Sequence, residues 1–528
     1  MNPPIKVIDL FSGPGGLGEG FSALKDADGK PIFKIAISIE KEASAHATLR
    51  LRAFYRQFGD NVPDEYFEFM KGNLGEKPEE KLYSLFPNEY KAADEEALCL
   101  TLGQDNDQIF KSIEKSIGHD ECILIGGPPC QAYSLAGPAR NNKNYIAEDD
   151  HRNFLYKEYL KVIAKFQPAV FVMENVKGML SAKINGKPIF DSIYRDLQNP
   201  TKFGLEQGSY TVNHHNYKLF SLVSSPLTSN DVDHPPQDFI IKSENYGIPQ
   251  KRHRVIILGI REDIADKWNS SMLLKEEKKI VTVKDVLNGL PELRSGLSKV
   301  KHHTREDWTN AVISIKKEVI PALSKSKIYK HNVIACELKN IIKNFQAPIN
   351  EQGSIFGLQA KKINSRNEIL NNWIHDERLN GYISNHETRG HIEKDLHRYL
   401  FCSAWAVCAE RENWDIATPK SNDYLDELVP NHANFKSGKF ADRFRVQAPH
   451  IPATTITSHI SKDGHYFIHP DPKQCRSLTV REAARIQTFP DNYFFAGSRT
   501  EQYVQVGNAV PPLLANQIAT SVMKLLLK

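Results

Sequence analysis

Cys130 stands out among the residues that could do chemistry, because it follows an abrupt stop to an apolar run. The run from Cys122 to Ile125 predicts a buried parallel strand, and the turn 126–129, Gly-Gly-Pro-Pro, ends it. In an open α/β sheet, ligands and chemistry gather beyond the carboxyl ends of the strands. The two prolines stiffen the turn, which would suit a nucleophilic thiol. A buried structural cysteine is the alternative, since free cysteine is commonly buried.

A carboxylate and two arginines are predicted to reach the same region. The apolar stretch 169–173 predicts a strand that ends at Glu174, which places this carboxyl group at the sheet edge that carries Cys130. Partly shielded from water, the group could stay protonated or share a proton with a base. Arg252 and Arg254 head a further expected strand, whose alternate residues project to one side. The pair would suit an anionic or carbonyl-bearing substrate, and exposed arginines on an edge strand are the alternative.

The N-terminal part has the pattern of a nucleotide-type cofactor site. A strand over 6–11 precedes the glycine-rich turn 12–21, and glycines let the backbone approach a ligand at a helix N-terminus. A second strand, 33–39, ends in Glu40, which could accept hydrogen bonds from both hydroxyls of a ribose. A third strand over 98–102 precedes Asp105, which could bind an adenine amino group. Glycine turns after strands are common, and Glu40 could equally be a surface carboxylate.

The segments that must position these residues alternate between strands and helices up to residue 261. Residues 50–97 predict a helical insertion, and 153–166 predict a helix before the strand at 169–173. The polar stretch 132–152 predicts a lid beside the nucleophile, since long loops in compact domains are usually functional or disordered. Near the C-terminus, Thr479 and Glu482 have the spacing of a capping box, which predicts a helix within 476–490. A final helix is expected to run to Lys528.

Residues 262 to 475 break this alternation and predict a second domain, because the 528-residue chain exceeds what one core usually serves. Residues 275–343 hold 15 Lys and Arg against 8 Asp and Glu. Such a basic tract could face phosphates or form a solvated helix surface. Short strands are expected near 454–457 and 465–469. The histidines and cysteines between 386 and 408 match no usual zinc spacing, so we expect no metal there.

The composition is that of an ordinary soluble globular protein, with 40% hydrophobic and 25% charged residues. The sequence has no apolar run of about 18 residues and no signal-peptide layout, so we expect an intracellular protein without a membrane segment. Its seven cysteines show no C-x-x-C spacing and predict reduced thiols. The net charge of +4 is too small to identify a partner.

Six motifs, taken together and in order, resemble those of the DNA (cytosine-5)-methyltransferases. They are DLFSGPGG at 9–16, GGPPCQAYS at 126–134, ENV at 174–176, QKRHR at 250–254, RSLTVREAARIQTFPD at 476–491 and QVGNAVPP at 505–512. The resemblance does not extend through 50–97 or most of 262–450. It implies an α/β fold with a Rossmann-like S-adenosylmethionine-dependent methyltransferase domain and a second, large target-recognition domain. The implied domains are 1–261 for catalysis, 262–499 for target recognition, including the 476–491 motif, and a C-terminal segment 500–528 that returns to the catalytic domain.

The same resemblance implies a role for each motif residue. Cys130 would add to C6 of cytosine, Glu174 would engage N3 and the exocyclic amine, and Arg254 would hold O2. Arg252 would steady the loop that carries the cysteine. S-adenosylmethionine would supply the methyl group for C5. The residues implied for binding this cofactor are Phe11, Gly13, Gly15, Gly16, Glu40, Asp105, Pro129, Leu155, Asn508 and Val510. No metal is implied.

The implied substrate is double-stranded DNA, from which the cytosine must be flipped out before it can reach the pocket. We expect a bacterial, cytoplasmic monomer in a restriction-modification or other phage-defence system, with a cognate restriction or defence protein as a further candidate partner. Two alternatives stay open: a cytosine-5 methyltransferase that acts on transfer RNA, and a catalytically silent DNA-binding protein. The large basic second domain argues against the first, and intact Cys130, Glu174 and Arg254 argue against the second.

Overall fold

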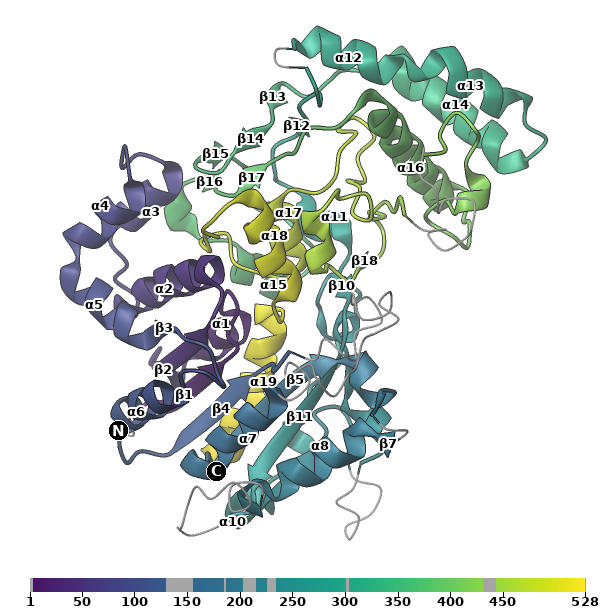
Figure 1. Ribbon diagram of the computed structural model, residues 1–528. Helices are drawn as coiled ribbons and strands as arrows, with labels where there is room; N and C mark the ends of the chain where they lie inside the picture. Colours follow the sequence, from purple (N-terminus) through teal and green to yellow (C-terminus); the bar gives the residue numbers. More distant parts are fainter. Residues whose placement is uncertain are drawn as a thin grey trace. The chain divides into compact units, whose positions relative to one another are not determined.

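The chain divides into two compact units (Figure 1). The computed structural model describes residues 3–129, 155–184, 187–202, 215–225, 234–300, 303–430 and 443–527. Unit 1 consists of Met1–Val62, Leu85–Lys278 and Ala509–Lys528, and unit 2 consists of Pro63–Ser84 and Lys279–Asn508. The expected lid 132–152 lies outside the described residues. Within the described residues, no helix is long and apolar enough to cross a membrane.

Unit 1 is built on one large sheet that is mostly parallel. The strand order is β3-β2-β1-β4-β5-β11-β8, and β9 also pairs with β11. The five strands β3, β2, β1, β4 and β5 pair in parallel in this order. Strand β11 runs antiparallel to its three neighbours β5, β8 and β9. The strands are β1 Ile5–Leu10, β2 Phe33–Glu40, β3 Ala97–Cys99, β4 Cys122–Gly126, β5 Val170–Val176, β8 Tyr217–Phe220, β9 Ile240–Lys242 and β11 His253–Arg261. The expected α/β fold is confirmed, and β4 is the buried parallel strand predicted before Cys130.

Helices α6, α7 and α8 pack on one face of this sheet and form the core of unit 1 with it (Figure 1). Helix α6 buries Ile109, Ile113 and Ile117, whose spacing of four residues places them on one helix face. They share a core cluster with Leu124 of β4 and Tyr159 of α7. The helices of unit 1 are α1 Gly16–Ser22, α2 Ala43–Gln57, α5 Pro87–Glu96, α6 Asn106–Ile117, α7 Leu155–Phe166, α8 Ile189–Gln198, α10 Glu262–Ala265 and α19 Pro512–Leu526.

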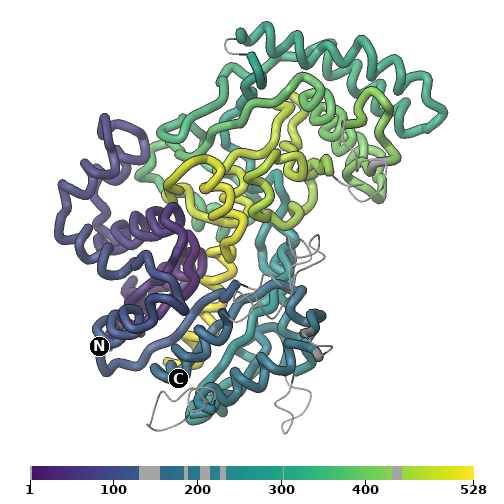
Figure 2. The backbone as a smooth tube through the Cα atoms, viewed as in Figure 1, coloured from purple at the N-terminus to yellow at the C-terminus, as the bar shows by residue number. Residues whose placement is uncertain are grey.

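The C-terminal helix α19 packs against α1, the first helix of the chain (Figure 2). The contact is so close that a Cβ atom added at Gly16 would collide with the carbonyl oxygen of Val510. A Cβ atom at Gly20 would collide with Ala515 in the same way. Glycine is therefore required on this face of α1 because backbone and helix meet directly. The C-terminal segment helps to fix the glycine-rich turn that precedes α1.

Unit 2 has a helical core and several two-stranded sheets. Helix α16 buries residues on every side, among them Tyr399 and Trp405, and α12 contributes the buried Trp308. A helix that is buried all round lies in the core of its domain. The helices are α3 Asp64–Lys71, α4 Pro78–Leu85, α11 Val283–Leu287, α12 Arg305–Ile313, α13 Ile315–Lys325, α14 Tyr329–Lys343, α15 Glu368–Ile374, α16 Glu393–Arg411, α17 Val480–Ile486 and α18 Arg499–Asn508. The strands are β12 Leu293–Arg294, β13 Asn350–Glu351, β14 Gly353–Ser354, β15 Leu358–Gln359, β16 Tyr382–Ile383, β17 His386–Glu387 and β18 Ala453–Thr454.

The 476–491 motif forms a buried ionic framework in unit 2. Thr479 and Glu482 make the predicted capping box, so this prediction is confirmed, although α17 covers only Val480–Ile486. The guanidinium of Arg476 donates to both oxygens of Glu482, at 2.8 and 2.7 Å. Arg485 donates to both oxygens of Asp491, at 2.9 and 2.7 Å. These paired charges are fully buried, and their partners compensate much of the cost of removing them from water.

The insertion expected over 50–97 is helical, as predicted, but part of it belongs to unit 2. Residues 63–84 contain α3 and most of α4. The carbonyl oxygen of Met70 accepts hydrogen bonds from the Gly357 backbone, at 3.0 Å, and from the Ser384 hydroxyl, at 2.7 Å. The Tyr66 hydroxyl donates to the carbonyl of Asn492 at 3.1 Å. This part of the insertion is therefore built into unit 2, while the functional assignment of the two domains stays a prediction.

Candidate active site

Glu40 ties the glycine-rich turn to the end of β2. Its carboxylate accepts a hydrogen bond from the Gly13 backbone N–H at 2.8 Å and a second one from the Glu42 N–H, also at 2.8 Å. Glu40 is buried, so it is not the surface carboxylate of the alternative interpretation. Each carboxylate oxygen can accept more than one hydrogen bond, which leaves capacity for the hydroxyls of a ribose. The carboxylate both orders the turn and could receive a ligand there.

The backbone of the turn has conformations that favour glycine. Gly13 has φ +56° and Gly15 has φ +95°, both in the left-handed region. Phe11 also has a positive φ of 55° and packs partly buried against the core of unit 1. A Cβ atom at Gly13 would meet no atom within 4 Å, so this side of the turn borders open space. At Gly13 the turn thus offers partly exposed backbone next to an aromatic ring, which fits a nucleotide-type cofactor.

Asp105, Leu155 and Val510 occupy defined positions in unit 1. The carboxylate of Asp105 accepts a hydrogen bond from the Thr101 N–H at 2.7 Å just before α6, and Leu155 is the first residue of α7. The strand predicted over 98–102 is shorter and earlier, at Ala97–Cys99, so Asp105 follows a turn and not a strand end. Val510 lies against Gly16. Asn508 ends α18 in unit 2 and is exposed.

An ion pair joins Glu174 and Arg254 across the neighbouring strands β5 and β11. The Nε atom of Arg254 lies 3.0 Å from Oε1 of Glu174, and both side chains are mostly buried. The strands are antiparallel, with Ile256 opposite Glu174, so Arg254 lies two residues along on the same face. A second oxygen of Glu174 would lie 3.0 Å from a Cβ atom at Gly127. The ion pair therefore borders the turn that leads to Cys130.

The turn 126–129 is held by the side chain of Asn175, the residue that follows Glu174. The Asn175 amide donates to the carbonyl oxygen of Pro128 at 3.1 Å, and Asn175 is buried. Pro129 is the last described residue of this turn, and Cys130 lies outside the described residues. In the sequence, Asn175 stands out only as a member of the 174–176 motif. Its value as an anchor follows from the hydrogen bond and could not be recognised from spacing.

Arg252 lies in a different setting from the one predicted for it. It falls between the short strand β10, Gln250–Lys251, and β11, and its backbone N–H donates to the Ser243 hydroxyl at 3.1 Å. Its side chain is buried, and burial lowers the pKa of Arg252. The charge of Arg254 lowers this pKa further and Glu174 opposes the shift, so the three groups interact. Arg252 is thus a buried guanidinium within electrostatic reach of the ion pair, and it does not head the strand.

Asp9 is a buried acid within β1, and its sequence position alone does not mark it as part of the site. It is 1% exposed, and burial raises its pKa to about 7. A Cβ atom at Gly18 would lie 2.9 Å from its carboxylate, so Asp9 faces α1. Nearby, Glu19 of α1 accepts two hydrogen bonds from Arg52 of α2, at 2.8 and 2.5 Å. An acid within an otherwise apolar strand was the available signal, because such a position buries it.

The histidines between 386 and 408 serve as internal hydrogen-bonding groups. His386 bonds to the Thr479 hydroxyl at 2.8 Å and to the carbonyl of Pro291 at 3.1 Å. Burial lowers the pKa of His386 to about 4, so it is neutral at ordinary pH. His397 bonds to the carbonyl of Ala311 at 2.9 Å. Among the described residues, no group of three His, Cys, Asp or Glu side chains is arranged to hold a metal ion.

Comparison with known proteins gives the family. Residues 101–524 match the family described as C-5 cytosine-specific DNA methylase. Type II methyltransferase M.Bpa9945I of Bacillus paralicheniformis is 32% identical over 98% of each chain. Type II methyltransferase M.AgeI of Thalassovita gelatinovora is 24% identical over 98% of this chain and 99% of the relative. The chain therefore belongs to the C-5 cytosine-specific DNA methylase family, and it is a DNA (cytosine-5)-methyltransferase.

A solved structure shares the fold. It is the crystal structure of an E. coli prophage-encoded protein assigned as a DNA modification methyltransferase. The two chains superpose with a TM-score of 0.51 at 19% identity, over 99% of this chain and 100% of the other. At this identity the likeness concerns the fold alone.

Proposed function

We propose that this enzyme methylates C5 of cytosine in duplex DNA by covalent catalysis through Cys130, with S-adenosylmethionine as methyl donor. The observation that carries the proposal is the Glu174–Arg254 ion pair beside the turn that leads to Cys130. C5 of cytosine is a weak nucleophile, so a thiolate must first add at C6 to raise the electron density at C5. A base inside a duplex cannot reach such a site, which requires that the cytosine be flipped out.

Each side chain then has one task. The Cys130 sulfur forms a bond to C6, and the Glu174 carboxylate takes up a proton from solvent and passes it to N3, so the ring does not carry a full negative charge. Arg254 holds Glu174 in position and stabilises the charge that develops at O2. After the methyl group has reached C5, a base removes the C5 proton, and the electrons of that C–H bond re-form the double bond as the sulfur leaves C6. Arg252, buried close by, would steady the loop that carries Cys130.

The glycine-rich turn fits S-adenosylmethionine, whose sulfonium supplies an electrophilic methyl group when bound. Glu40 would receive the ribose hydroxyls, since it is buried at the turn and already orders it. Gly13 would leave room for the ligand beside Phe11, while Gly15 and Gly16 would contribute by the left-handed conformation of the turn and its close packing on Val510. Further contacts would come from Asp105 toward the adenine, and from Pro129, Leu155, Asn508 and Val510.

Unit 2 would recognise the target sequence through base edges in the major groove, with its lysines on phosphates. The bacterial relatives named type II methyltransferases support a place in a restriction-modification system. A monomer in the bacterial cytoplasm, with a cognate restriction or defence protein, completes this proposal.

The test is methyl transfer to DNA with a matched variant. Purified enzyme is incubated with labelled S-adenosylmethionine and mixed-sequence duplex DNA, beside a Cys130→Ala variant, and the product is mapped by bisulfite sequencing. We expect labelled 5-methylcytosine at one sequence context from the wild type and none from the variant. Transfer to transfer RNA instead of DNA would favour the RNA alternative, and cofactor binding without transfer to either would favour the silent DNA-binding protein.

A further inference from the structure

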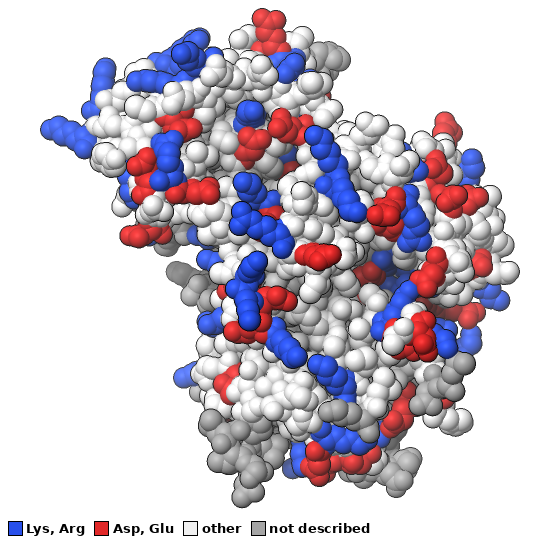
Figure 3. All heavy atoms as spheres, turned by 180° about the vertical axis from the view of Figure 1, so that it is seen from behind, with Lys and Arg blue, Asp and Glu red and all other residues white. Residues whose placement is uncertain are grey.

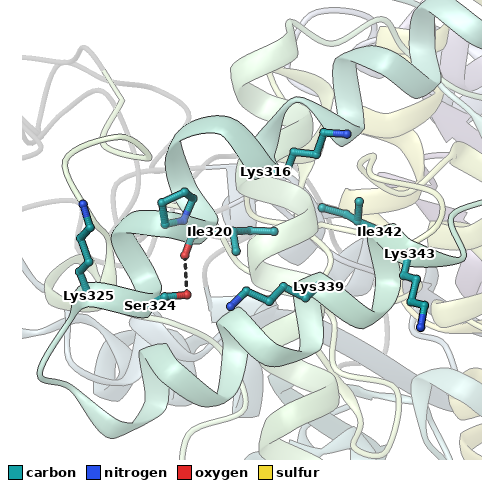
Figure 4. Close-up of a pocket in the computed structure, with 8 residues that line it drawn as sticks. Lys316, Ile320, Ser324, Lys325, Lys339, Ile342 and Lys343 are labelled. Carbon is teal, nitrogen blue, oxygen red and sulfur yellow. Dashed lines mark hydrogen bonds between the residues drawn. The ribbon is translucent and has the colours of Figure 1, made fainter.

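The strongest feature outside the candidate active site is a lysine-lined groove between α13 and α14 of unit 2. The two helices pack against each other, and a cavity of about 610 Å³ lies along them (Figure 4). Ile320 and Ile342 point into the space between the helices. Four exposed lysines surround this apolar floor: Lys316, Lys325, Lys339 and Lys343. We call this set the lysine groove.

The helical hairpin turns its acidic residues away from the lysine groove. Residues 315–343 contain seven lysines and two acids, Glu318 and Glu337. Glu337 pairs with Arg411 of α16 at 2.6 Å. Glu318 is two residues from Lys316, on the opposite side of α13. On that side, the charge of Glu318 raises the pKa of His397 on α16, although burial lowers the same pKa by more. Among the described residues, none that lines the groove is acidic.

The remaining lysine of α14, Lys330, lies on a different face of the helix from the groove lysines. Lys330 lies over the rings of Trp405 and Trp414, at 5.4 and 5.0 Å, on the side that faces the core of unit 2. The four groove lysines face solvent. Lys and Arg side chains are also visible over the α12 to α14 part of the surface (Figure 3). Long lysine stems can lie on an apolar floor while their ammonium groups stay in water, where they can meet a polyanion.

We propose that the lysine groove binds the phosphate backbone of the DNA substrate as a sequence-independent contact. This inference rests on the proposed function, because duplex DNA is the polyanion that the enzyme must hold. Lysines contact phosphates as mobile point charges and carry no sequence information, which suits a positioning contact. An acidic protein partner is the competing occupant, and the experiment below separates the two.

The test compares two variants that lose the same charge. The groove variant is Lys316→Gln, Lys325→Gln, Lys339→Gln and Lys343→Gln. The control variant replaces four other exposed lysines by glutamine: Lys77, Lys81, Lys91 and Lys115. Binding of a duplex of about 30 base pairs is measured by fluorescence anisotropy between about 50 and 300 mM salt, and the slope of log K against log salt is recorded. Circular dichroism and the unfolding temperature show that each variant is folded.

Each lost phosphate contact lowers the magnitude of the slope of log K against log salt by about 0.9. The magnitude of this slope should therefore be smaller by about 3 to 4 in the groove variant than in the wild type. The control variant should keep the wild-type slope within about 1. A groove variant with the wild-type slope would overturn the inference, and so would equal losses in both variants, since these would reflect net charge alone. The wild type's own methyl transfer to the same duplex is measured separately. Its absence would count against the proposed function whatever the slopes show.

Discussion

Replacing Glu40 with glutamine tests the link between the glycine-rich turn and the cofactor. Glutamine has nearly the same shape, but its amide has only one oxygen. The Glu40 carboxylate accepts one N–H from Gly13 and one from Glu42, each at 2.8 Å. In the variant, one of these N–H groups would face the NH₂ group of the amide, so a donor would meet a donor. Glu42→Gln is the control, because the Glu42 side chain is exposed.

The size of the effect follows from the lost hydrogen bond. A hydrogen bond to a charged group contributes about 1.5–3 kcal/mol, and Glu40 is buried, so water cannot replace it fully. If the turn must be ordered for S-adenosylmethionine to bind, this loss becomes a change in affinity. We therefore expect the Kd for the cofactor to rise about 10- to 100-fold in Glu40→Gln. The lost contact to the ribose hydroxyls adds to this effect.

Isothermal titration calorimetry with S-adenosylmethionine measures both Kd values, and thermal unfolding without cofactor measures what the turn alone has lost. Glu42→Gln should bind within about twofold of the wild type, a difference well below 1 kcal/mol. A Glu40→Gln variant that also binds within twofold of the wild type would refute the reasoning. Glu40 would then be a structural carboxylate that the cofactor does not need.

Three further predictions concern the ion pair, a buried acid and the framework of unit 2. Arg254→Lys keeps the charge but loses the guanidinium geometry that reaches Glu174, so single-turnover methyl transfer should slow by about 10- to 100-fold, while exposed Lys251→Arg should leave it unchanged. An equal rate in Arg254→Lys would contradict the assigned role. Burial raises the pKa of Asp9 to about 7, so the wild type is stabilised by protonation, and this stabilisation is lost as pH rises from the unfolded value of 3.8 toward 7. Asp9→Asn should therefore gain about 2 kcal/mol over the wild type between pH 5 and pH 7 in urea unfolding, and a constant difference would contradict this. Arg485→Met leaves buried Asp491 without its ion pair and should cost about 3–5 kcal/mol in the same assay, so an unchanged unfolding midpoint would contradict the framework.

The sequence predicted the parts of the fold that depend on local pattern. The apolar run before Cys130 is a buried parallel strand, because strands of a parallel sheet are covered on both faces and are apolar throughout. The capping box at Thr479 is present because its two residues satisfy each other's backbone groups without help from the rest of the chain. Local rules of this kind need no knowledge of tertiary structure.

Features that depend on distant contacts were missed. Residues 63–84 form the predicted helices, but no local signal shows that Met70 would bond to residues near 357 and 384. The predicted strand over 98–102 is displaced to Ala97–Cys99, because pairing with β2 sets its limits. Arg252 was expected on a strand, yet it occupies a break between β10 and β11 and is buried. Burial of a charged side chain depends on the assembled unit and has no periodic signature.

The most direct test of the central claim is to trap the bond between Cys130 and the base. Duplex DNA is prepared with 5-fluorocytosine at the mapped target. In this base, fluorine replaces the C5 hydrogen that a base must remove as a proton before the sulfur can leave C6. The covalent adduct therefore persists after methyl transfer. We predict that the wild type with S-adenosylmethionine gives a protein–DNA complex that survives denaturing electrophoresis, and that Cys130→Ala gives none. Equal adducts from both proteins, or no adduct from a wild type that methylates the unmodified duplex, would contradict covalent catalysis by Cys130.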